Sequence, residues 1–266
     1  MGTAIEMHPT CKKIRSEILN ISHKSGHGHI PTSFSIIEMM TAVYQTMNHD
    51  PNQPDSPDRD MFVLSKGHAS LGLYCTLAGH GYFPFEEVYA FGQFDSTFGC
   101  HPDRTKVPGA EASTGSLGHG IGLAVGMALG ARIKGTPRKV YTLVGDGESN
   151  EGSVWEAVMV ASNLKLANLT VLYDNNSSQG RCLPIPNPAE RFASFGCDVI
   201  EVNGHDLEAL KSALKQPANT VRVVVCNTVK GYGCKTLSDN VYEWHRRAPK
   251  ADELDMLLGE LNAGNV

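Results

Sequence analysis

The segment 140–176 constrains the fold of this 266-residue chain more than any other part of the sequence. Residues 140–144 and 169–173 are mostly apolar runs of strand length, which predict two buried strands. A turn, Gly145-Asp146-Gly147, follows the first run, and a helical pattern over 153–163 leads to the second. Because strands joined through a helix usually pair in parallel with a right-handed crossover, this unit predicts a parallel sheet covered by helices.

The same alternation of strands and helices extends over the rest of the chain. Further strands are expected at 61–64, 199–202 and 221–226, and further helices at 71–77 and after Asp206. Two more helices are expected near the N-terminus, with apolar faces formed by Ile14, Ile18 and Ile21 and by Phe34, Ile37, Met40 and Tyr44. No linker or repeat divides the sequence, so we expect one α/β domain over residues 1–266, with a mostly parallel sheet and helices on both faces.

Two local patterns add detail to this prediction. Ser153 and Glu156 have the spacing of a capping box, which places the start of one helix at Ser153. Gly118, Gly122, Gly126 and Gly130 recur at every fourth residue and therefore share one face of another helix. Such a face either lets a second backbone approach closely or simply allows tight packing within the chain.

The charge and cysteine content exclude several classes of protein. Lys and Arg number 23 against 28 Asp and Glu, and a net charge of −5 is no general reason to bind nucleic acid or anionic membranes. The N-terminal residues lack the apolar core of a secretory signal, and the most apolar stretch, 117–133, is too short and glycine-rich to span a bilayer. Seven scattered cysteines without a CxxC pair indicate buried thiols. We therefore expect a cytoplasmic protein with no nucleic-acid and no membrane partner.

Asp146 and Asn176 are the first candidates for chemistry, because each follows a predicted strand. The carboxyl ends of adjacent parallel strands meet at one edge of the sheet, where ligands of such folds bind. A carboxylate and an amide oxygen suit Mg²⁺, which usually completes its shell with ligand phosphates and water. Both sequences are also common in ordinary turns and loops; their spacing and topology favour a metal–diphosphate site.

Histidines in glycine- or proline-rich turns are the second signal. They are His27, His29, His68, His101 and His245. Functional residues concentrate on loops held by a rigid scaffold, although a lone histidine is more often structural. The HxH spacing of His27 and His29 also suggests zinc, but neither an HExxH motif nor a compact Cys/His set accompanies it.

Eight motifs follow one another along the chain. They are SGHGHIPTSFSIIEM (25–39), RDMFVLSKGHASLGLY (59–74), GCHPD (99–103), STGSLGHGIGLAVGMALG (113–130), GDGESNEGSVWEA (145–157), NLTVLYDNN (168–176), VKGYG (229–233) and EWHRRAP (243–249). Together they resemble the N-terminal, diphosphate-binding domain of transketolase, and most closely the separate N-terminal subunit of a split transketolase. The resemblance implies a thiamine diphosphate-binding fold.

The resemblance also implies roles for individual residues. Asp146 and Asn176 match side-chain ligands of Mg²⁺ (or Ca²⁺ or Mn²⁺), with Ser178 giving its backbone carbonyl. Among residues that match cofactor contacts of the family, Gly147 corresponds to a contact of the diphosphate, and Gly115 and Leu117 correspond to contacts of the aminopyrimidine. Lys66 and Lys230 match basic residues near the cofactor channel. Glu151 matches the acidic residue that links paired active sites. His68, His101 and His245 match histidines around the thiazolium and the donor sugar. The family has one further active-site histidine, which matches His29 by its distance from Glu38 or His27 by the sequence Ser-Gly-His; we favour His29. At His119 the chain departs from the family, whose longer members usually have Gln at this position.

The activity implied by the resemblance is the thiamine diphosphate- and Mg²⁺-dependent transfer of a two-carbon ketol unit from a ketose, by default a sugar phosphate, to an aldose. None of these motifs matches the pyrimidine-binding domain of the family. The expected partner is therefore a C-terminal transketolase subunit that supplies this domain, in a heterotetramer with two copies of each chain. An α subunit of a 2-oxo acid dehydrogenase and a non-catalytic cofactor-binding module are the alternatives. The sugars, their anionic groups and the oligomeric state of the isolated chain are left open.

Overall fold

The computed structural model describes residues 6–264, which form a five-stranded, fully parallel sheet. The strands are β1 (Met61–Leu64), β2 (Val140–Gly145), β3 (Leu169–Asn175), β4 (Asp198–Asn203) and β5 (Arg222–Asn227), in the spatial order β1-β2-β3-β5-β4. The central strands β2 and β3 pair in a register that sets Gly145 opposite Asp174. Their carboxyl ends therefore open at the same edge of the sheet.

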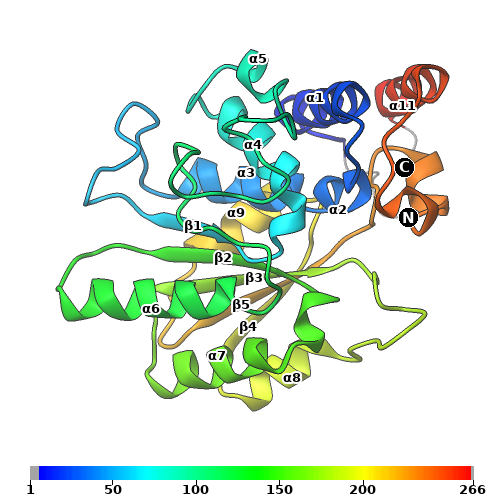
Figure 1. Ribbon diagram of the computed structural model, residues 1–266. Coiled ribbons are helices and arrows are strands. Elements are labelled where there is room, and N and C mark those ends of the chain that lie inside the picture. Colours follow the sequence, from blue (N-terminus) through cyan, green and yellow to red (C-terminus); the bar gives the residue numbers. More distant parts are fainter. Residues whose placement is uncertain (1–5, 265–266) are drawn as a thin grey trace.

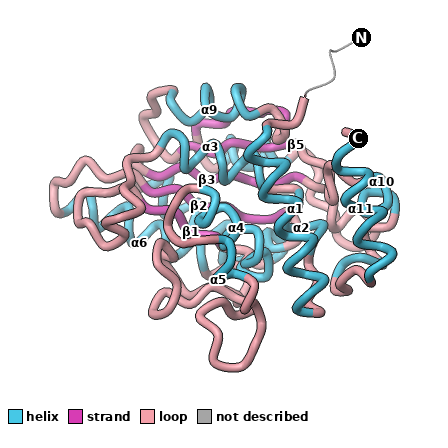
Figure 2. The backbone as a smooth tube through the Cα atoms, turned by 90° about the horizontal axis from the view of Figure 1, so that it is seen from above, coloured by secondary structure: helices cyan, strands magenta, loops and turns pink. Residues whose placement is uncertain are grey.

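Helices cover both faces of this sheet (Figure 1). One face carries α1 (Pro9–Ser25), α3 (Ile37–Thr46), α4 (Ser70–Gly79) and α9 (Leu207–Lys215), and the other carries α6 (Gly120–Ile133), α7 (Gly152–Asn163) and α8 (Pro188–Ser194). The connections contain α2 (Ile30–Phe34), α5 (Phe85–Val88), α10 (Lys235–Asp239) and the 3₁₀ turns η1 (Gly67–Ala69), η2 (Glu148–Asn150) and η3 (Glu243–His245). The last helix, α11 (Ala251–Ala263), packs beside α1 (Figure 2).

The two cores follow from the alternation of side chains along the strands. In β2, Tyr141 and Leu143 belong to the core beneath α1, α3 and α4, whereas Val140 and Val144 belong to the core beneath α6 and α7. Because both faces of the strand are buried, the run is apolar at almost every position, as is usual in parallel sheets. The predicted α/β class, with a parallel sheet and helices on both faces, is confirmed.

Two expectations about helices are wrong. The apolar face from Phe34 to Tyr44 belongs to two helices, because the chain breaks after α2 and Ser35 turns its hydroxyl to Asp174 (2.8 Å). The capping box is also absent: α7 begins at Gly152, its N-cap is Glu151, and no side chain caps it. Ser153 instead lies inside the helix against Gly118, whose φ of 79° suits a residue without a Cβ.

The glycine stripe and the cysteines also differ in part from expectation. Gly118 precedes α6, and a Cβ built on Gly122, Gly126 or Gly130 would meet nothing within 4 Å, so these three glycines form an open face of the described chain rather than a packed one. Four cysteines are buried thiols (Cys11, Cys75, Cys226 and Cys234), Cys197 is half-buried, and Cys100 and Cys182 are exposed. Within residues 6–264, no helix has both the length and the apolar character needed to cross a membrane.

Candidate active site

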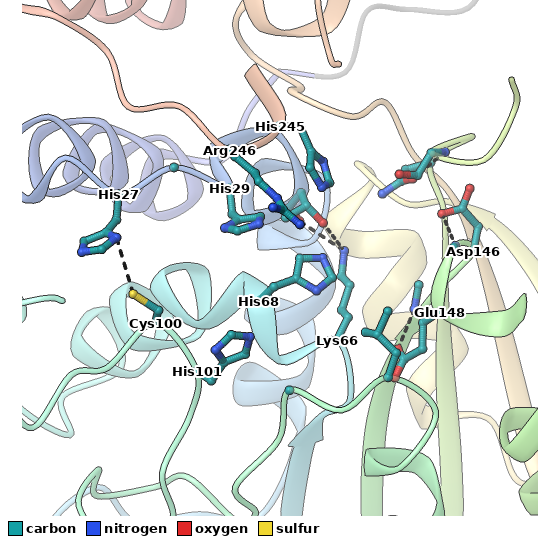
Figure 3. A pocket seen from close by; sticks show the side chains of 18 of the residues that line it. His27, His29, Lys66, His68, Cys100, His101, Asp146, Glu148, His245 and Arg246 are labelled. Atoms are coloured by element: carbon teal, nitrogen blue, oxygen red, sulfur yellow. Dashed lines mark hydrogen bonds between the residues drawn. The ribbon is translucent and has the colours of Figure 1, made fainter. Parts of the chain in front are cut away.

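A cavity of about 570 Å³ lies at the carboxyl edge of the sheet (Figure 3). The segments that follow β1, β2 and β3 form its floor, and the segments around residues 26–32, 99–101 and 245–246 form its walls. Predicted site residues that line it are His29, Lys66, His68, His101, Gly115, Leu117, Asp146, Gly147, Asn176, Ser178 and His245, together with the alternative His27. Counting the segment 115–117, topology thus brings predicted site residues from seven segments of the chain to one place.

Asp146 and Asn176 present their oxygens at the floor of this cavity. One carboxylate oxygen of Asp146 accepts the N–H of Gly147 (2.7 Å), and the other accepts the N–H of Gln179 (3.3 Å). The side-chain oxygen of Asn176 accepts the N–H of Ser178 (3.0 Å). Burial, and next the charge of Asp174, raise the pKa of Asp146 above its usual value, so a cation beside this carboxylate would stabilise its charged form.

Asp174 lies behind this pair and was not predicted as a site residue. Its carboxylate is fully buried and accepts hydrogen bonds from the ammonium of Lys66 (2.6 Å), the hydroxyl of Ser35 (2.8 Å) and the amide nitrogen of Asn176 (2.6 Å). A carboxylate cannot donate, so the nitrogen end of the Asn176 amide must face Asp174 and its oxygen must face away. Lys66, although it lines the cavity, is therefore already paired.

The glycine turn after β2 leaves room at the floor. A Cβ on Gly147 would lie 2.9 Å from the side-chain nitrogen of Gln179, so the missing side chain lets the end of Gln179 approach the turn closely. Glu148, also not predicted, is buried beside the turn and accepts hydrogen bonds from Ser65 (2.5 Å) and from the N–H groups of Gly118 (3.0 Å) and Gly145 (3.2 Å). It ties the turn to the segment that carries Gly115 and Leu117.

Three of the histidines form a cluster above the floor. Gly26 ends α1 with φ 73°, and the short connection that follows places His29 at the start of α2 with φ 66°. The His29 ring lies 5.4 Å, centroid to centroid, from the rings of both His68 and His245. Burial, followed by the nearby charges of His245 and Arg246, lowers the pKa of His29 to about 4.

The other imidazoles of the cluster are shifted in the same direction. Burial, and next the charge of Lys66, lower the pKa of His68 to about 2. Burial and the charge of Lys230 also lower the pKa of His245. These rings are therefore neutral at pH 7, and each has a nitrogen that can accept a proton.

His101 and His27 lie elsewhere on the wall. His101 is exposed and packs against Gly115, where φ is 149° and a Cβ would lie only 2.7 Å from the His101 ring. His27 packs edge-on against Phe91 (5.7 Å), and its Nδ1 lies 3.6 Å from the sulfur of Cys100. The structure therefore brings His29, rather than His27, into ring contact with His68 and His245.

Some predicted residues lie outside the lining of the cavity. Lys230 lies one layer behind it, donating to the Ser178 hydroxyl (2.6 Å) with its nitrogen 3.5 Å from His245 Nδ1. Glu151 and His119 are exposed N-cap residues of α7 and α6. Conversely, the cavity lining includes six residues that were not predicted to belong to the site: Thr32, Phe91, Cys100, Glu148, Gln179 and Arg246. Thr32, Cys100, Glu148 and Arg246 lie within the recognised motifs and Gln179 lies three residues after one, whereas Phe91 has no such signal.

A parallel α/β sheet with a glycine turn and an Asp/Asn oxygen pair at its carboxyl edge defines a domain suited to a metal-bound diphosphate. The family profile described as "Transketolase, thiamine diphosphate binding domain" matches residues 8–262. The chain belongs to this family, as the sequence motifs predicted.

Similar proteins of about the same length include subunits of two transketolases. The apulose-4-phosphate transketolase of Actinobacillus succinogenes has a subunit that is 38% identical over 266 residues, which cover 96% of this chain and 96% of the relative. The 6-deoxy-6-sulfo-D-fructose transketolase subunit SqwG of Clostridium sp. (strain MSTE9) is 36% identical over 86% of each chain.

Solved structures of longer transketolases share the fold. A transketolase from Pichia stipitis superposes with a TM-score of 0.89 at 29% identity, covering 95% of this chain and 40% of that one. A transketolase from Leishmania mexicana gives a TM-score of 0.86 at 29% identity and 42% coverage of its chain. The chain therefore spans about two fifths of the length of these enzymes.

Proposed function

We propose that this chain is the diphosphate-binding subunit of a two-subunit transketolase, which transfers a two-carbon ketol unit from a ketose to an aldose. The observation that carries the proposal is one cavity in which the Asp146–Asn176 oxygen pair lies below the cluster of His29, His68 and His245. An oxygen site for a metal ion and a set of neutral imidazoles together suit a phosphorylated cofactor and a polyhydroxylated substrate.

The cofactor that we propose is thiamine diphosphate with Mg²⁺, or Ca²⁺ or Mn²⁺ in its place. The residues present fit it: Asp146, Asn176 and the Ser178 carbonyl are hard oxygen donors, and Gly147, which has no side chain, lines the cavity beside them. We assign Gly115 and Leu117, which also line the cavity, to the aminopyrimidine. When bound, this cofactor supplies the nucleophilic carbon and the electron sink for ketol transfer.

The chain's own residues bind substrate oxygens and move protons. His29 and His68, neutral at pH 7, can each accept a hydrogen bond or a proton from a hydroxyl of the ketose. We place His101 and His245 on other oxygens of the same sugar, because both face the cavity. Lys230 orients Ser178 and approaches His245 from behind, so we treat it as a positioning residue.

The partner that we propose is a C-terminal transketolase subunit that supplies the pyrimidine-binding domain, in a heterotetramer with two copies of each chain. The side-by-side helices α6 and α7 offer a surface for assembly, because Leu123, Met159 and Val160 are each nearly half exposed and Gly126 leaves its face open. Glu151 lies at the N-terminus of α7, where a residue that links paired sites would have to reach the interface. Relatives named as subunits support the two-chain arrangement.

Two alternatives make different predictions. The α subunit of a 2-oxo acid dehydrogenase would also need the Asp146–Asn176 pair, but the family match and the subunit relatives favour transketolase. A non-catalytic module would keep cofactor without turnover, and four cavity histidines argue against it. We also propose a cytoplasmic location, since all seven cysteines are free thiols.

The test is to purify the chain with its co-expressed C-terminal subunit, then supply thiamine diphosphate and Mg²⁺, and follow the products from ketose and 2-oxo acid donors. Transfer of a two-carbon unit from a ketose to an aldose is the expected result. Decarboxylation of a 2-oxo acid without ketol transfer would indicate the dehydrogenase alternative, and cofactor binding without either reaction would indicate a binding module.

A further inference from the structure

Arg246 is an unpaired cation at the wall of the cavity. Two Lys or Arg side chains line the cavity, Lys66 and Arg246, and Lys66 forms an ion pair with Asp174 at 2.6 Å. Arg246, in contrast, makes no side-chain hydrogen bond or ion pair with any residue in 6–264, although it is followed by Arg247, which is paired with Glu253 (2.8 Å). Its exposed side chain extends beside His29 and His245 into the cavity (Figure 3). A ligand can therefore reach its guanidinium without breaking an existing contact.

The backbone around Arg246 is held firmly against the cavity. A Cβ on Gly28 would overlap the carbonyl of Arg246, so the two segments approach as closely as backbones can. Trp244, two residues before, is buried, and the guanidinium of Arg247 lies 3.5 Å from its ring centroid. Arg246 is thus a flexible side chain on a fixed base, which suits recognition of a substrate group that is held in one place.

Arg246 adds a positive charge to its side of the cavity. Its own charge lowers the pKa of both His29 and His245, and Lys230 lies on the far side of His245. The cavity carboxylates, Asp146 and Glu148, are at the opposite side of the cavity, where we assign the metal and the diphosphate (Figure 3). An anion that enters near Arg246 therefore meets the guanidinium before it reaches these carboxylates.

We propose that Arg246 determines substrate specificity by binding an anionic group, a phosphate ester or a sulfonate, on the sugar. This inference rests on the proposed function. A guanidinium matches the paired oxygens of both groups and donates two parallel hydrogen bonds to them. The names of two similar subunits specify a 4-phosphate and a 6-sulfo sugar, which are substrates of this chemical class.

A first experiment measures how the charge of Arg246 changes the electrostatic potential in the cavity, and it needs neither cofactor, partner nor turnover. Cys100 lines the same cavity and is exposed, so its thiolate can displace iodide from iodoacetate, an anion, or from iodoacetamide, which is neutral. The ratio of the two rates, read for each cysteine by peptide mass spectrometry at low salt, reports the local potential. Arg246→Gln is expected to lower this ratio at Cys100 by up to about twofold, the size of effect that Coulomb's law gives in water for one unit charge within about 10 Å.

Matched controls locate the effect. Cys182 is exposed but does not line the cavity, so its ratio should not change in Arg246→Gln. Arg181→Gln, which removes an exposed arginine beside Cys182, should lower the ratio at Cys182 and leave Cys100 as it was. An unchanged ratio at Cys100 in Arg246→Gln would overturn the proposal.

A second experiment uses the reconstituted enzyme with a phosphorylated, a sulfonated and an uncharged ketose of equal chain length. Arg246→Gln should lower kcat/KM for the anionic donors relative to the uncharged one about tenfold to hundredfold, as expected for hydrogen bonds to a charged group. Arg246→Lys should restore part of this ratio, because it keeps the charge and loses the paired donors. The phosphate and sulfonate arms show which anion is preferred.

The outcomes separate this proposal from the proposed function. Equal losses for charged and uncharged donors would overturn the specificity role and indicate a structural one. If no sugar reacts in the unsubstituted pair, the proposed function fails, and the alkylation ratio still decides whether Arg246 makes an anion site.

Discussion

Asn176 donates its amide N–H to the buried carboxylate of Asp174 over 2.6 Å, and this contact determines which end of the Asn176 amide faces the cavity. The same carboxylate neutralises Lys66 at 2.6 Å. One residue behind the floor therefore orients a proposed metal ligand and balances the charge of a cavity lysine. Neither function requires Asp174 to touch the cofactor.

Replacing Asp174 with Asn should destabilise the chain strongly, because it leaves the buried ammonium of Lys66 without a counter-charge. Breaking a buried pair in this way costs about 3–5 kcal/mol. Urea unfolding of the isolated chain measures the loss. Lys66→Met in the same chain removes the unpaired charge, so the double variant should be more stable than Asp174→Asn alone; a double variant that is no more stable would contradict the pairing.

The metal pair gives a second prediction. Asp146→Asn keeps the shape of the side chain and removes its charge, so thiamine diphosphate titrated with Mg²⁺ should bind the reconstituted pair more than about tenfold more weakly, a loss seen even for partners behind metal ligands. Asn175→Ala is the matched control, because the side chain of Asn175 donates a hydrogen bond to Asn227 and does not line the cavity. Equal affinities in Asp146→Asn and Asn175→Ala would refute the assignment of Asp146.

His101 separates a chemical role from a structural one. It is exposed, so His101→Ala should change the free energy of unfolding by less than about 0.5 kcal/mol. Ketol transfer should nevertheless fall by a factor of about 10²–10⁴ if His101 moves a proton, while cofactor still binds. His119→Ala, at the exposed start of α6, is the control and should retain activity. Loss of folding in His101→Ala would favour the structural interpretation.

The pH dependence of stability follows from the buried imidazoles. The folded chain holds His29 with a pKa of about 4, below the usual 6.5, so between these values the unfolded chain binds more protons. Stability contributed by neutral His29 is therefore present above pH 6.5 and is lost as pH falls toward 4. As pH falls from 6.5 toward 4, the free energy of unfolding should decrease less steeply in His29→Asn than in His119→Gln. Parallel curves would contradict the shift.

The open glycine face of α6 predicts opposite effects of two substitutions. Gly126→Ala should stabilise the isolated chain by up to about 1 kcal/mol, because alanine favours a helix and its methyl group meets open space. Gly126→Arg should leave the chain folded but weaken assembly, detected by native mass spectrometry as loss of the expected complex with two copies of each subunit. Normal assembly of Gly126→Arg would place the interface elsewhere.

Apolar runs were sufficient to predict the sheet, because strands buried on both faces leave a continuous local signal. The predicted strand at 61–64 coincides with β1, and Asp206 caps α9 through the N–H of Ala209 as expected of a residue before a helix. These features depend on neighbours within a few residues.

Features that depend on distant residues could not be predicted in this way. The break between α2 and α3 involves Ser35 and Asp174, which are 139 positions apart, and no local pattern joins them. The role of Glu148 likewise depends on Gly118. The expected capping box failed because α7 begins one residue earlier, at Gly152, which places Ser153 inside the helix against Gly118. The unpaired state of Arg246 is visible only once its surroundings are known.

The measurement that tests the account most directly is a titration of the chain with its C-terminal partner at saturating thiamine diphosphate and Mg²⁺, with ketol transfer as the readout. The account predicts no transfer by the chain alone, an increase in proportion to added partner, and a plateau at one partner per chain. Full turnover by the chain without a partner would contradict the proposal that a second subunit supplies the pyrimidine-binding domain of the active enzyme.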